Sequence, residues 1–160
     1  MIVVADTSPI CYLILIDEVE LLAELFGVVC IPEAVASELR HPAVPAPVAE
    51  FLAAPPQWLE IRGVGREEAS SQVMALDEGE RAAILLAQGI EADLVILDDR
   101  AAREAARSAG LKVTGTLGIL EAGARRGRVD LRAAVKRLRK TNFRASPALL
   151  AEVLERHHRS

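Results

Sequence analysis

The chain alternates between short, wholly apolar runs and longer segments in which apolar residues recur every three to four positions. The wholly apolar runs predict strands buried on both faces of a parallel sheet, because a strand with one solvent-exposed face would alternate apolar and polar residues. These runs cover residues 2–5, 28–31, 94–97 and the shorter 112–114. Residues 58–61 alternate instead, so we expect either an edge strand or a loop there.

The segments between these runs have the apolar spacing of helices. Pro32 stands at the favoured first helical position of one segment, and Gly110 is the expected cap that ends another. Strands that alternate with helices of this length predict a parallel α/β sheet. The predicted helices cover residues 9–16, 18–26, 32–40, 77–90, 100–109, 117–126, 131–139 and 146–158.

Length and composition fit one domain that needs no disulfide bonds to stay folded. A chain of 160 residues buries roughly 70% of its unfolded surface, and a hydrophobic fraction of 51% excludes a disordered protein. The proline-rich residues 41–47 predict an extended surface loop, and glycines within 62–66 predict a second break. Aromatic residues make up only 3% of the chain, which disfavours a dedicated single-strand binder that stacks bases.

Cysteine usage and the N-terminal pattern predict a cytoplasmic protein with no membrane contact. Cys11 and Cys30 lie inside apolar runs and are expected to be buried, reduced thiols, because their spacing fits neither a disulfide framework nor a zinc site. No basic segment precedes an apolar stretch at the N-terminus, since Asp6 appears almost at once. The longest apolar run, residues 9–16, is far too short to span a bilayer.

The net charge of −4 conceals two halves of opposite sign. Residues 1–99 carry four arginines and no lysine against 18 acidic residues, a net charge of −14. Residues 100–160 carry 15 basic residues against five acidic ones, a net charge of +10. This asymmetry predicts a cation site in one part and a surface for a polyanion or an acidic partner in the other. For most individual charges, a solvated helix face is the alternative.

Acidic residues follow two of the predicted strands at the point where each strand ends. Asp6 follows residues 2–5, and Asp98 and Asp99 follow residues 94–97. Ligands of open α/β sheets bind at the carboxyl ends of the strands, and neighbouring strands lie roughly 4.8 Å apart. These acids therefore share one site if their strands are neighbours. A set of oxygen ligands without His or Cys suits Mg²⁺ or Mn²⁺.

Two acids on predicted helices could join this site. Glu38 lies on the helix that follows the second strand, and Glu80 lies in the first turn of the helix over 77–90. Glu38 could instead be only a solvated helix residue, and Glu80 stands three positions after Asp77, which is the spacing of a capping box. A helix N-cap is the alternative for the acids that follow strands, namely Asp6, Asp98 and Asp99.

These acidic segments resemble the PIN-domain family. Residues 3–9 (VVADTSP) resemble its Asp-Thr-Ser start, Glu38 falls at its second acidic position, and Glu80 in LDEGERAAILLA falls at its third. Residues 94–120 (LVILDDRAAREAARSAGLKVTGTLGIL) resemble its final acidic block. The resemblance covers residues 1–126. It is strongest to a VapC-like toxin branch in which an Asp-Asp pair and a Thr-Gly-Thr-Leu-Gly segment recur.

The resemblance implies a single domain over residues 1–160 with a three-layer α/β/α PIN-like fold. Its core would span 1–126 around a mostly parallel sheet, and a helical tail would span 127–160. It further implies a Mg²⁺- or Mn²⁺-dependent endoribonuclease that hydrolyses phosphodiesters of single-stranded or structured RNA. The implied partners are an RNA substrate, a small antitoxin protein encoded beside the toxin and a second copy of the chain. The implied metal ligands and catalytic groups are Asp6, Glu38, Glu80, Asp98 and Asp99.

The final acidic block departs from the family pattern, which has Thr-x-Asp and an aromatic residue shortly afterwards. Leu97 stands at the Thr position and Ala102 near the aromatic one. Alignment favours Asp99 as the equivalent acid, whereas the end of the strand favours Asp98, so both stay candidates. The departure keeps open a catalytically weak or silent PIN-fold module that binds protein or RNA. A phosphatase has less support, because no Asp-x-Asp motif follows the first strand.

Hydroxyl and basic side chains could assist such a site. Thr7 and Ser8 could orient a carboxylate or a phosphate oxygen, or could merely satisfy a helix N-terminus. The helix over 131–139 has its apolar residues on one side and a basic outer face, which we expect to guide RNA unless it is only solvated. The expected RNA contacts are Arg125, Arg126, Arg128, Lys136, Arg137 and Lys140.

Overall fold

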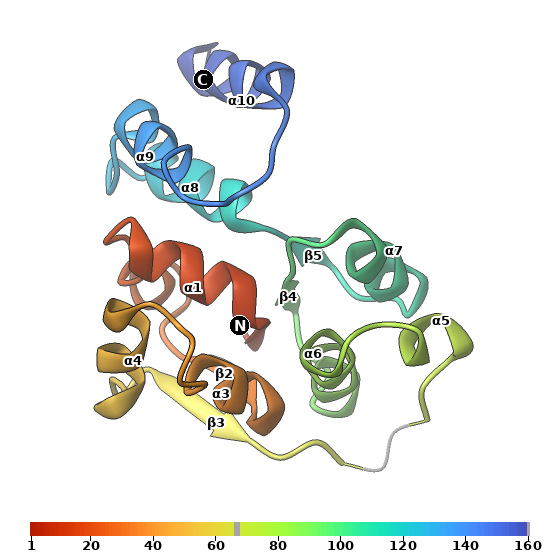
Figure 1. The fold of residues 1–160 in the computed structure, drawn as a ribbon. Coiled ribbons are helices and arrows are strands. Elements are labelled where there is room, and N and C mark those ends of the chain that lie inside the picture. Colours follow the sequence, from red (N-terminus) through yellow and green to blue (C-terminus); the bar gives the residue numbers. More distant parts are fainter. Residues whose placement is uncertain (66–67, 160) are drawn as a thin grey trace.

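The computed structural model describes residues 1–65 and 68–159. Five parallel strands form one sheet in the order β3-β2-β1-β4-β5, with helices on both faces (Figure 1), so the predicted α/β/α fold is confirmed. The strands are β1 (Val3–Ala5), β2 (Val29–Pro32), β3 (Leu59–Arg62), β4 (Leu94–Ile96) and β5 (Val113–Thr114). The helices are α1 (Thr7–Leu15), α2 (Leu21–Phe26), α3 (Glu33–Leu39), α4 (Ala46–Ala53), α5 (Ser71–Met74), α6 (Glu78–Gly89), α7 (Arg100–Ser108), α8 (Thr116–Arg125), α9 (Leu131–Leu138) and α10 (Pro147–Arg159).

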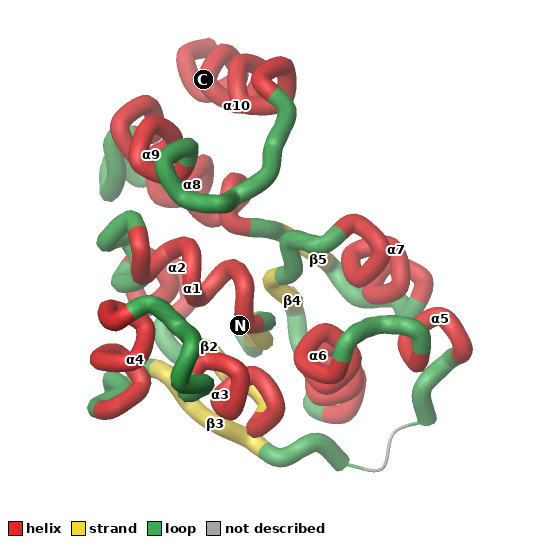
Figure 2. Tube along the Cα trace, in the orientation of Figure 1, coloured by secondary structure: helices red, strands yellow, loops and turns green. Residues whose placement is uncertain are grey.

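The two central strands are apolar throughout because both of their faces are covered. Every residue of β1 and β2 is buried. Val3 and Ala5 belong to a core cluster shared with α1, α2 and α8, whereas Val4 belongs to a second cluster shared with α6 and α7. Figure 2 shows these two groups of helices on opposite sides of the strands.

The register places the ends of β1 and β4 side by side. Ala5 is the partner of Ile96 in the parallel pairing, and the N–H of Asp6 donates to the carbonyl oxygen of Ile96 over 3.0 Å. The two strands that end in acid are therefore neighbours, as their shared site requires. Residues 58–61 also form a strand, β3, which pairs only with β2 and so forms an edge of the sheet.

The proline-rich segment was predicted wrongly. Part of residues 41–47 is helical, because α4 begins at Ala46 and Pro47 occupies its first turn, where proline's missing N–H costs no helical hydrogen bond. Pro32 also lies one position earlier than predicted, since it ends β2 and is the N-cap of α3. The four-residue helix α5 was not predicted, because so short a segment shows no helical periodicity. Within the predicted glycine-rich break, Arg66 lies outside the described residues.

Several helix boundaries differ from the sequence pattern by a few residues. The first helix begins at Thr7, because Asp6 is its N-cap. The second begins only at Leu21, because Asp17 adopts a positive φ of 61° and interrupts the helical path before it. The helix over 100–108 ends as expected, with Gly110 at a φ of 84° just beyond it.

The last three helices pack on the side of the sheet that carries α1 and α2. Leu131, Ala134, Val135 and Leu138 are buried, which confirms the amphipathic pattern of α9. Val153 of α10 is buried in the same core cluster. In Figure 1, α10 lies beyond α8 and α9 at the far end of the molecule. Among the described residues, no helix is long and apolar enough to cross a membrane.

Candidate active site

Asp6 stands at the carboxyl end of β1 and is almost completely buried, with 5% of its surface exposed. It is the N-cap residue of α1, yet its side chain makes no capping hydrogen bond, and its Oδ1 has no hydrogen-bond partner among the described residues. Burial is the main cause that raises the pKa of Asp6 to about 7, with the nearby charges of Asp77, Glu38 and Asp98 acting in the same direction. Capping therefore does not explain this carboxylate.

Glu38 is hydrogen-bonded to the first residue of α1, next to Asp6. The hydroxyl of Thr7 donates to Oε2 of Glu38, which is half-buried on α3 rather than solvated. A Cβ added to Gly79 of α6 would lie 2.6 Å from Oε1 of Glu38, so the carboxylate rests against the glycine backbone. Ser8 is exposed, and its hydroxyl has no recorded partner among the described residues.

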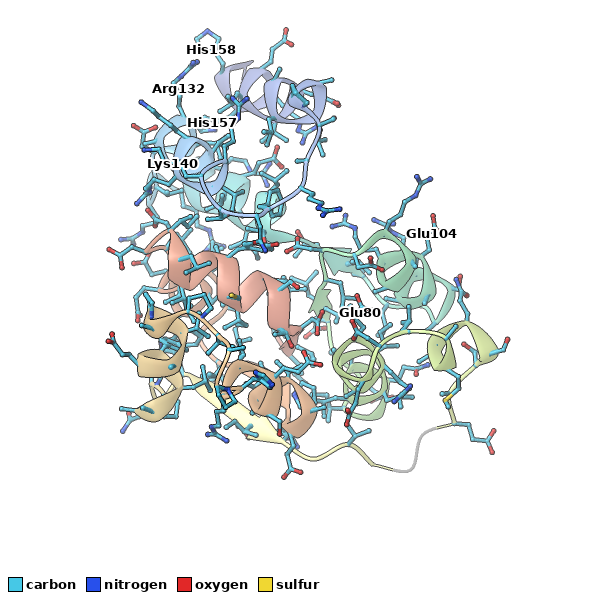
Figure 3. The ribbon with its side chains drawn as sticks, in the orientation of Figure 1. Glu80, Glu104, Arg132, Lys140, His157 and His158 are labelled. Atoms are coloured by element: carbon cyan, nitrogen blue, oxygen red, sulfur yellow. The ribbon has the colours of Figure 1, made fainter. Side chains whose placement is uncertain are left out.

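Glu80 serves as a helix cap and also faces other acids. Asp77 Oδ1 accepts the N–H of Glu80 over 2.8 Å, and the N–H of Asp77 donates to Glu80 Oε1 over a longer 3.4 Å. The capping box suggested by the sequence is thus present. Burial raises the pKa of Glu80 to about 8, and the charges of Asp77, Asp99 and Asp6 add to that rise. Figure 3 shows Glu80 projecting from α6.

Asp98 and Asp99 have different roles in the structure. Asp99 is exposed and caps α7, since its Oδ2 accepts the N–H of Ala102 over 3.0 Å. Asp98 is half-buried and accepts two hydrogen bonds from Thr116, from the N–H over 2.8 Å and from the hydroxyl over 2.6 Å. Burial raises the pKa of Asp98, while the two Thr116 bonds and the charge of Arg103 oppose that rise.

The departure from the family pattern at Leu97 has a structural counterpart. Leu97 is fully buried in the core beneath α6 and α7, so a side chain at this position points away from the acidic edge. Thr116, also fully buried, supplies a hydroxyl to the acidic block from the first residue of α8. Ala102 is buried in the same cluster as Leu97.

Sequence reasoning missed three residues that shape this edge: Gly79, Arg103 and Thr116. Thr116 lies in the Thr-Gly-Thr-Leu-Gly segment, whose recurrence was a signal without an assigned role. A glycine in the first turn of an otherwise strong helix was a second signal, because glycine disfavours helix and needs a packing reason there. Arg103 had no signal, because its place beside Asp98 depends on how α7 packs.

The carboxylates come from four elements and crowd negative charge at one end of the sheet. Across the described residues, no group of three or more Asp, Glu, His or Cys side chains is arranged to hold a metal ion as it stands. Glu80 and Asp99 are engaged in caps, while the orphaned Oδ1 of Asp6 is a buried acceptor that lacks a partner. An all-oxygen donor set with excess negative charge fits a hard divalent cation, and Asp6 is already free to bind it.

The basic residues predicted to contact RNA lie elsewhere on the surface. Lys136 and Lys140 are exposed on and just after α9, and Figure 3 shows Lys140 and Arg132 well away from Glu80. Arg137 pairs with Glu18 over 2.8 Å, which ties α9 to the end of α1. The remaining three, at the end of α8, are exposed: Arg125, Arg126 and Arg128.

A family model described as a PIN domain matches residues 2–159, which extends from before β1 to the end of α10. No curated protein matches the chain.

Proposed function

The chain belongs to the PIN-domain family, whose members are generally nucleases, and on this basis we propose that it is a divalent-metal-dependent ribonuclease. The observation that carries the proposal is the Oδ1 atom of Asp6, a buried carboxylate oxygen without a partner at the end of a central strand. Buried polar atoms are nearly always satisfied, and an unsatisfied one in a native structure calls for a ligand or an ion. Because the neighbouring side chains are acidic, an ion bound there would be a cation.

The proposed ligand set is Asp6 and Asp98 from the strand ends, together with Glu38, Glu80 and Asp99. When bound, a Mg²⁺ or Mn²⁺ ion would offset phosphate charge and lower the pKa of water for attack on the phosphodiester. The chain itself orients the ligands. Thr7 holds the carboxylate of Glu38, and Thr116 holds that of Asp98 with two donors. Such supporting hydrogen bonds fix the direction in which a ligand points.

Cleavage of mixed cellular RNA tests the proposal. We expect cleavage with Mg²⁺ or Mn²⁺ and none in EDTA, and we expect Asp6→Asn to lose at least about 100-fold, since metal stabilisation of the transition state is worth several kcal/mol. Asp17→Asn is the matched control, because Asp17 is exposed at the end of α1 and its positive φ suits asparagine. Full cleavage in EDTA, or by the Asp6→Asn protein, would contradict the mechanism.

A second candidate function is a PIN-fold module that binds RNA or protein without cutting it. The observation that favours it is the engagement of Glu80 and Asp99 in helix caps, because a capping carboxylate must give up its backbone donor to turn towards a metal. The same assay separates the two functions. Retained RNA binding with no cleavage in either metal would establish the silent module.

The resemblance to the VapC-like branch supports a biological role, and we propose that the chain is a cytoplasmic toxin with a small antitoxin partner. Expression of the wild-type chain should arrest growth, whereas Asp6→Asn should not. A small reading frame beside the gene should relieve the arrest when co-expressed. Light scattering of the purified chain tests the proposed homodimer. Growth arrest that persists in Asp6→Asn would separate toxicity from nuclease activity.

The basic outer face of α9 remains a proposed guide for RNA. Lys136 and Lys140 are exposed there and form no ion pair among the described residues. Each neutralised phosphate lowers the binding constant by about 0.7 logarithmic units for every tenfold rise in salt on a single strand, and by about 0.9 on a duplex. Replacing both lysines with glutamine should therefore flatten the salt dependence of RNA binding, and an unchanged slope would remove this face from the proposal.

A further inference from the structure

A cavity of about 660 Å³ opens beside the acidic edge. Its walls are α7, β5, the start of α8, the connection that follows α9, and α10. Figure 1 shows α7 and β5 on one side and this connection with α10 on the other. Asp98 and Gly115 belong to the lining, so the cavity adjoins the acid that Thr116 holds. Its volume lies within the roughly 300–1,000 Å³ of small-molecule sites.

Five arginines line this cavity, and three of them have no carboxylate partner. Arg100 pairs with Glu104 over 3.3 Å, and Arg156 pairs with Glu121 over 2.6 Å. Within the described part of the chain, no ion pair is formed by the other three lining arginines: Arg103, Arg107 and Arg144. The charges of Arg107 and Arg144 are therefore not neutralised by an ion pair, while Arg103 lies near the charge of Asp98.

Two of the unpaired arginines stand one helical turn apart on α7. Arg103 and Arg107 have the i, i+4 spacing that places side chains on one helix face, where like charges destabilise the helix. Arg103 is half-buried, and its Nη1 donates to the carbonyl oxygen of Leu97 over 3.2 Å, which directs its guanidinium towards the end of β4. An anion between these groups would relieve their repulsion, and guanidinium groups match phosphate geometry.

The wall formed by the connection after α9 and by α10 carries apolar side chains beside Arg144 and Arg156. Phe143 lies there with Leu149 and Val153, and Leu149 leaves 41% of its surface exposed. The ring of Phe143 packs edge-on against Tyr12, with ring centroids 5.1 Å apart and an interplanar angle of 89°. Tyr12 thus steadies Phe143 from the α1 side. An aromatic ring that is held in place, in a cavity that also contains cationic side chains, can stack on a base while the cations bind its phosphate.

We propose that this cavity is a subsite for one phosphate-bearing nucleotide of the RNA, next to the phosphodiester that is cut. The phosphate meets Arg107 and Arg144, with Arg103 on the side of the acidic edge, and the base packs against Phe143. This inference rests on the proposed ribonuclease function, because the nucleotide lies next to Asp98. It gives the nuclease a means to hold single-stranded RNA despite its few aromatic residues.

Nucleotide binding to the Asp6→Asn protein in EDTA tests the subsite without any cleavage. The probes are adenosine 5′-monophosphate, adenosine and inorganic phosphate, measured by calorimetry. We expect the monophosphate to bind more tightly than either fragment. The double variant Arg107→Gln/Arg144→Gln should raise the Kd for the monophosphate at least about tenfold, because a tenfold change corresponds to the loss of one charge-assisted hydrogen bond. The matched control, Arg40→Gln with Lys112→Gln, removes the same charge from exposed residues outside the cavity lining and should leave monophosphate binding unchanged.

Three further results decide the proposal. Phe143→Leu should reduce the advantage of the monophosphate over inorganic phosphate, because it keeps apolar bulk but removes the ring. A fluorescent ten-nucleotide oligoadenylate should be displaced by the monophosphate. The proposal is overturned if the arginine pair and the control pair weaken binding equally. It is also overturned if the monophosphate and the oligonucleotide bind without competing, which would indicate a site for free nucleotides. Cleavage of RNA without nucleotide binding here would leave the nuclease intact and remove only the subsite.

Discussion

The acidic edge and the arginine cavity meet at Asp98 and are built in opposite ways. At the edge, acids from four elements converge on the nearly buried Asp6, and burial with like charges raises pKa values. In the cavity, three arginines stand in a space of about 660 Å³ without carboxylate partners. The edge thus gathers acidic groups, whereas the cavity has more arginines than acids, since its lining holds five arginines with Asp98, Glu104 and Glu121.

The difference between the regions lies in how tightly their groups are held. The carboxylates of Glu38 and Asp98 are each held by a threonine, while Arg107 and Arg144 form no side-chain hydrogen bond or ion pair among the described residues. Fixed groups suit an ion whose ligands must keep a set geometry, and mobile cations suit a phosphate chain that can arrive in several positions. The three predictions below test this contrast, in order of decreasing expected effect.

Replacing Asp6 should stabilise the metal-free protein at alkaline pH. A carboxyl whose folded pKa of about 7 exceeds the ordinary 3.8 contributes stability below about pH 4, and that stability is lost as pH rises through about 7. Three pKa units correspond to about 4 kcal/mol. In EDTA, the unfolding free energy of Asp6→Asn minus that of wild type should therefore increase by up to about 4 kcal/mol between about pH 4 and 8. Urea unfolding at several pH values measures this difference in unfolding free energy. If Asp6→Asn is less stable than wild type by the same amount at every pH, Asp6 is only a helix cap.

Removing the hydroxyl that holds Asp98 should have the next largest effect on stability. Thr116→Val keeps the shape of a fully buried side chain but deletes a 2.6 Å bond to a carboxylate. We expect a loss of about 2 kcal/mol near pH 8, typical of a hydrogen bond to a charged group. Thr114→Val is the control, because this threonine has no recorded hydrogen bond to an acid among the described residues. The loss should shrink in an Asp98→Ala background, and simple additivity would refute the coupling.

Gly79→Ala should move stability and activity in opposite directions. Alanine favours helix over glycine by up to about 1 kcal/mol, and the obstacle to its Cβ is the mobile end of Glu38, 2.6 Å away. We therefore expect equal or higher stability with cleavage reduced about tenfold, since a misdirected ligand typically costs that much. In a Glu38→Ala background the substitution should have no further effect on cleavage. Equal cleavage by Gly79→Ala and wild type would show that the carboxylate need not rest there.

The central strands and most of the helices, but not α4 and α5, could be predicted from the sequence because they depend on local periodicity. Residues 2–5 and 94–97 are apolar at every position, which only a doubly covered strand explains, and their acids mark the carboxyl ends. The parallel arrangement then brings Asp6 and Asp98 to one edge. The helix cap at Asp77 could also be predicted, because its donors lie within one turn.

The contacts between distant elements could not be predicted from one sequence. The bonds from Thr7 to Glu38 and from Thr116 to Asp98 join residues 31 and 18 positions apart, and no local pattern encodes which helix meets which. The same holds for the arginine cavity, whose walls come from α7 and the tail. The error at residues 41–47 has a simpler cause, because proline is common both in loops and in the first turn of a helix, and Pro47 lies in the first turn of α4.

The pairing of β1 with β4 also determines when the protein can become active as it is made. Val3 pairs with Val29 on one side and with Leu94 on the other, so β1 meets β2 early but meets β4 only after some ninety further residues have been added. Asp98 then requires Thr116 to hold it. Chains are synthesised from the N-terminus and long-range strand pairing is slow. A nascent chain therefore has no assembled acidic edge until α8 has left the ribosome.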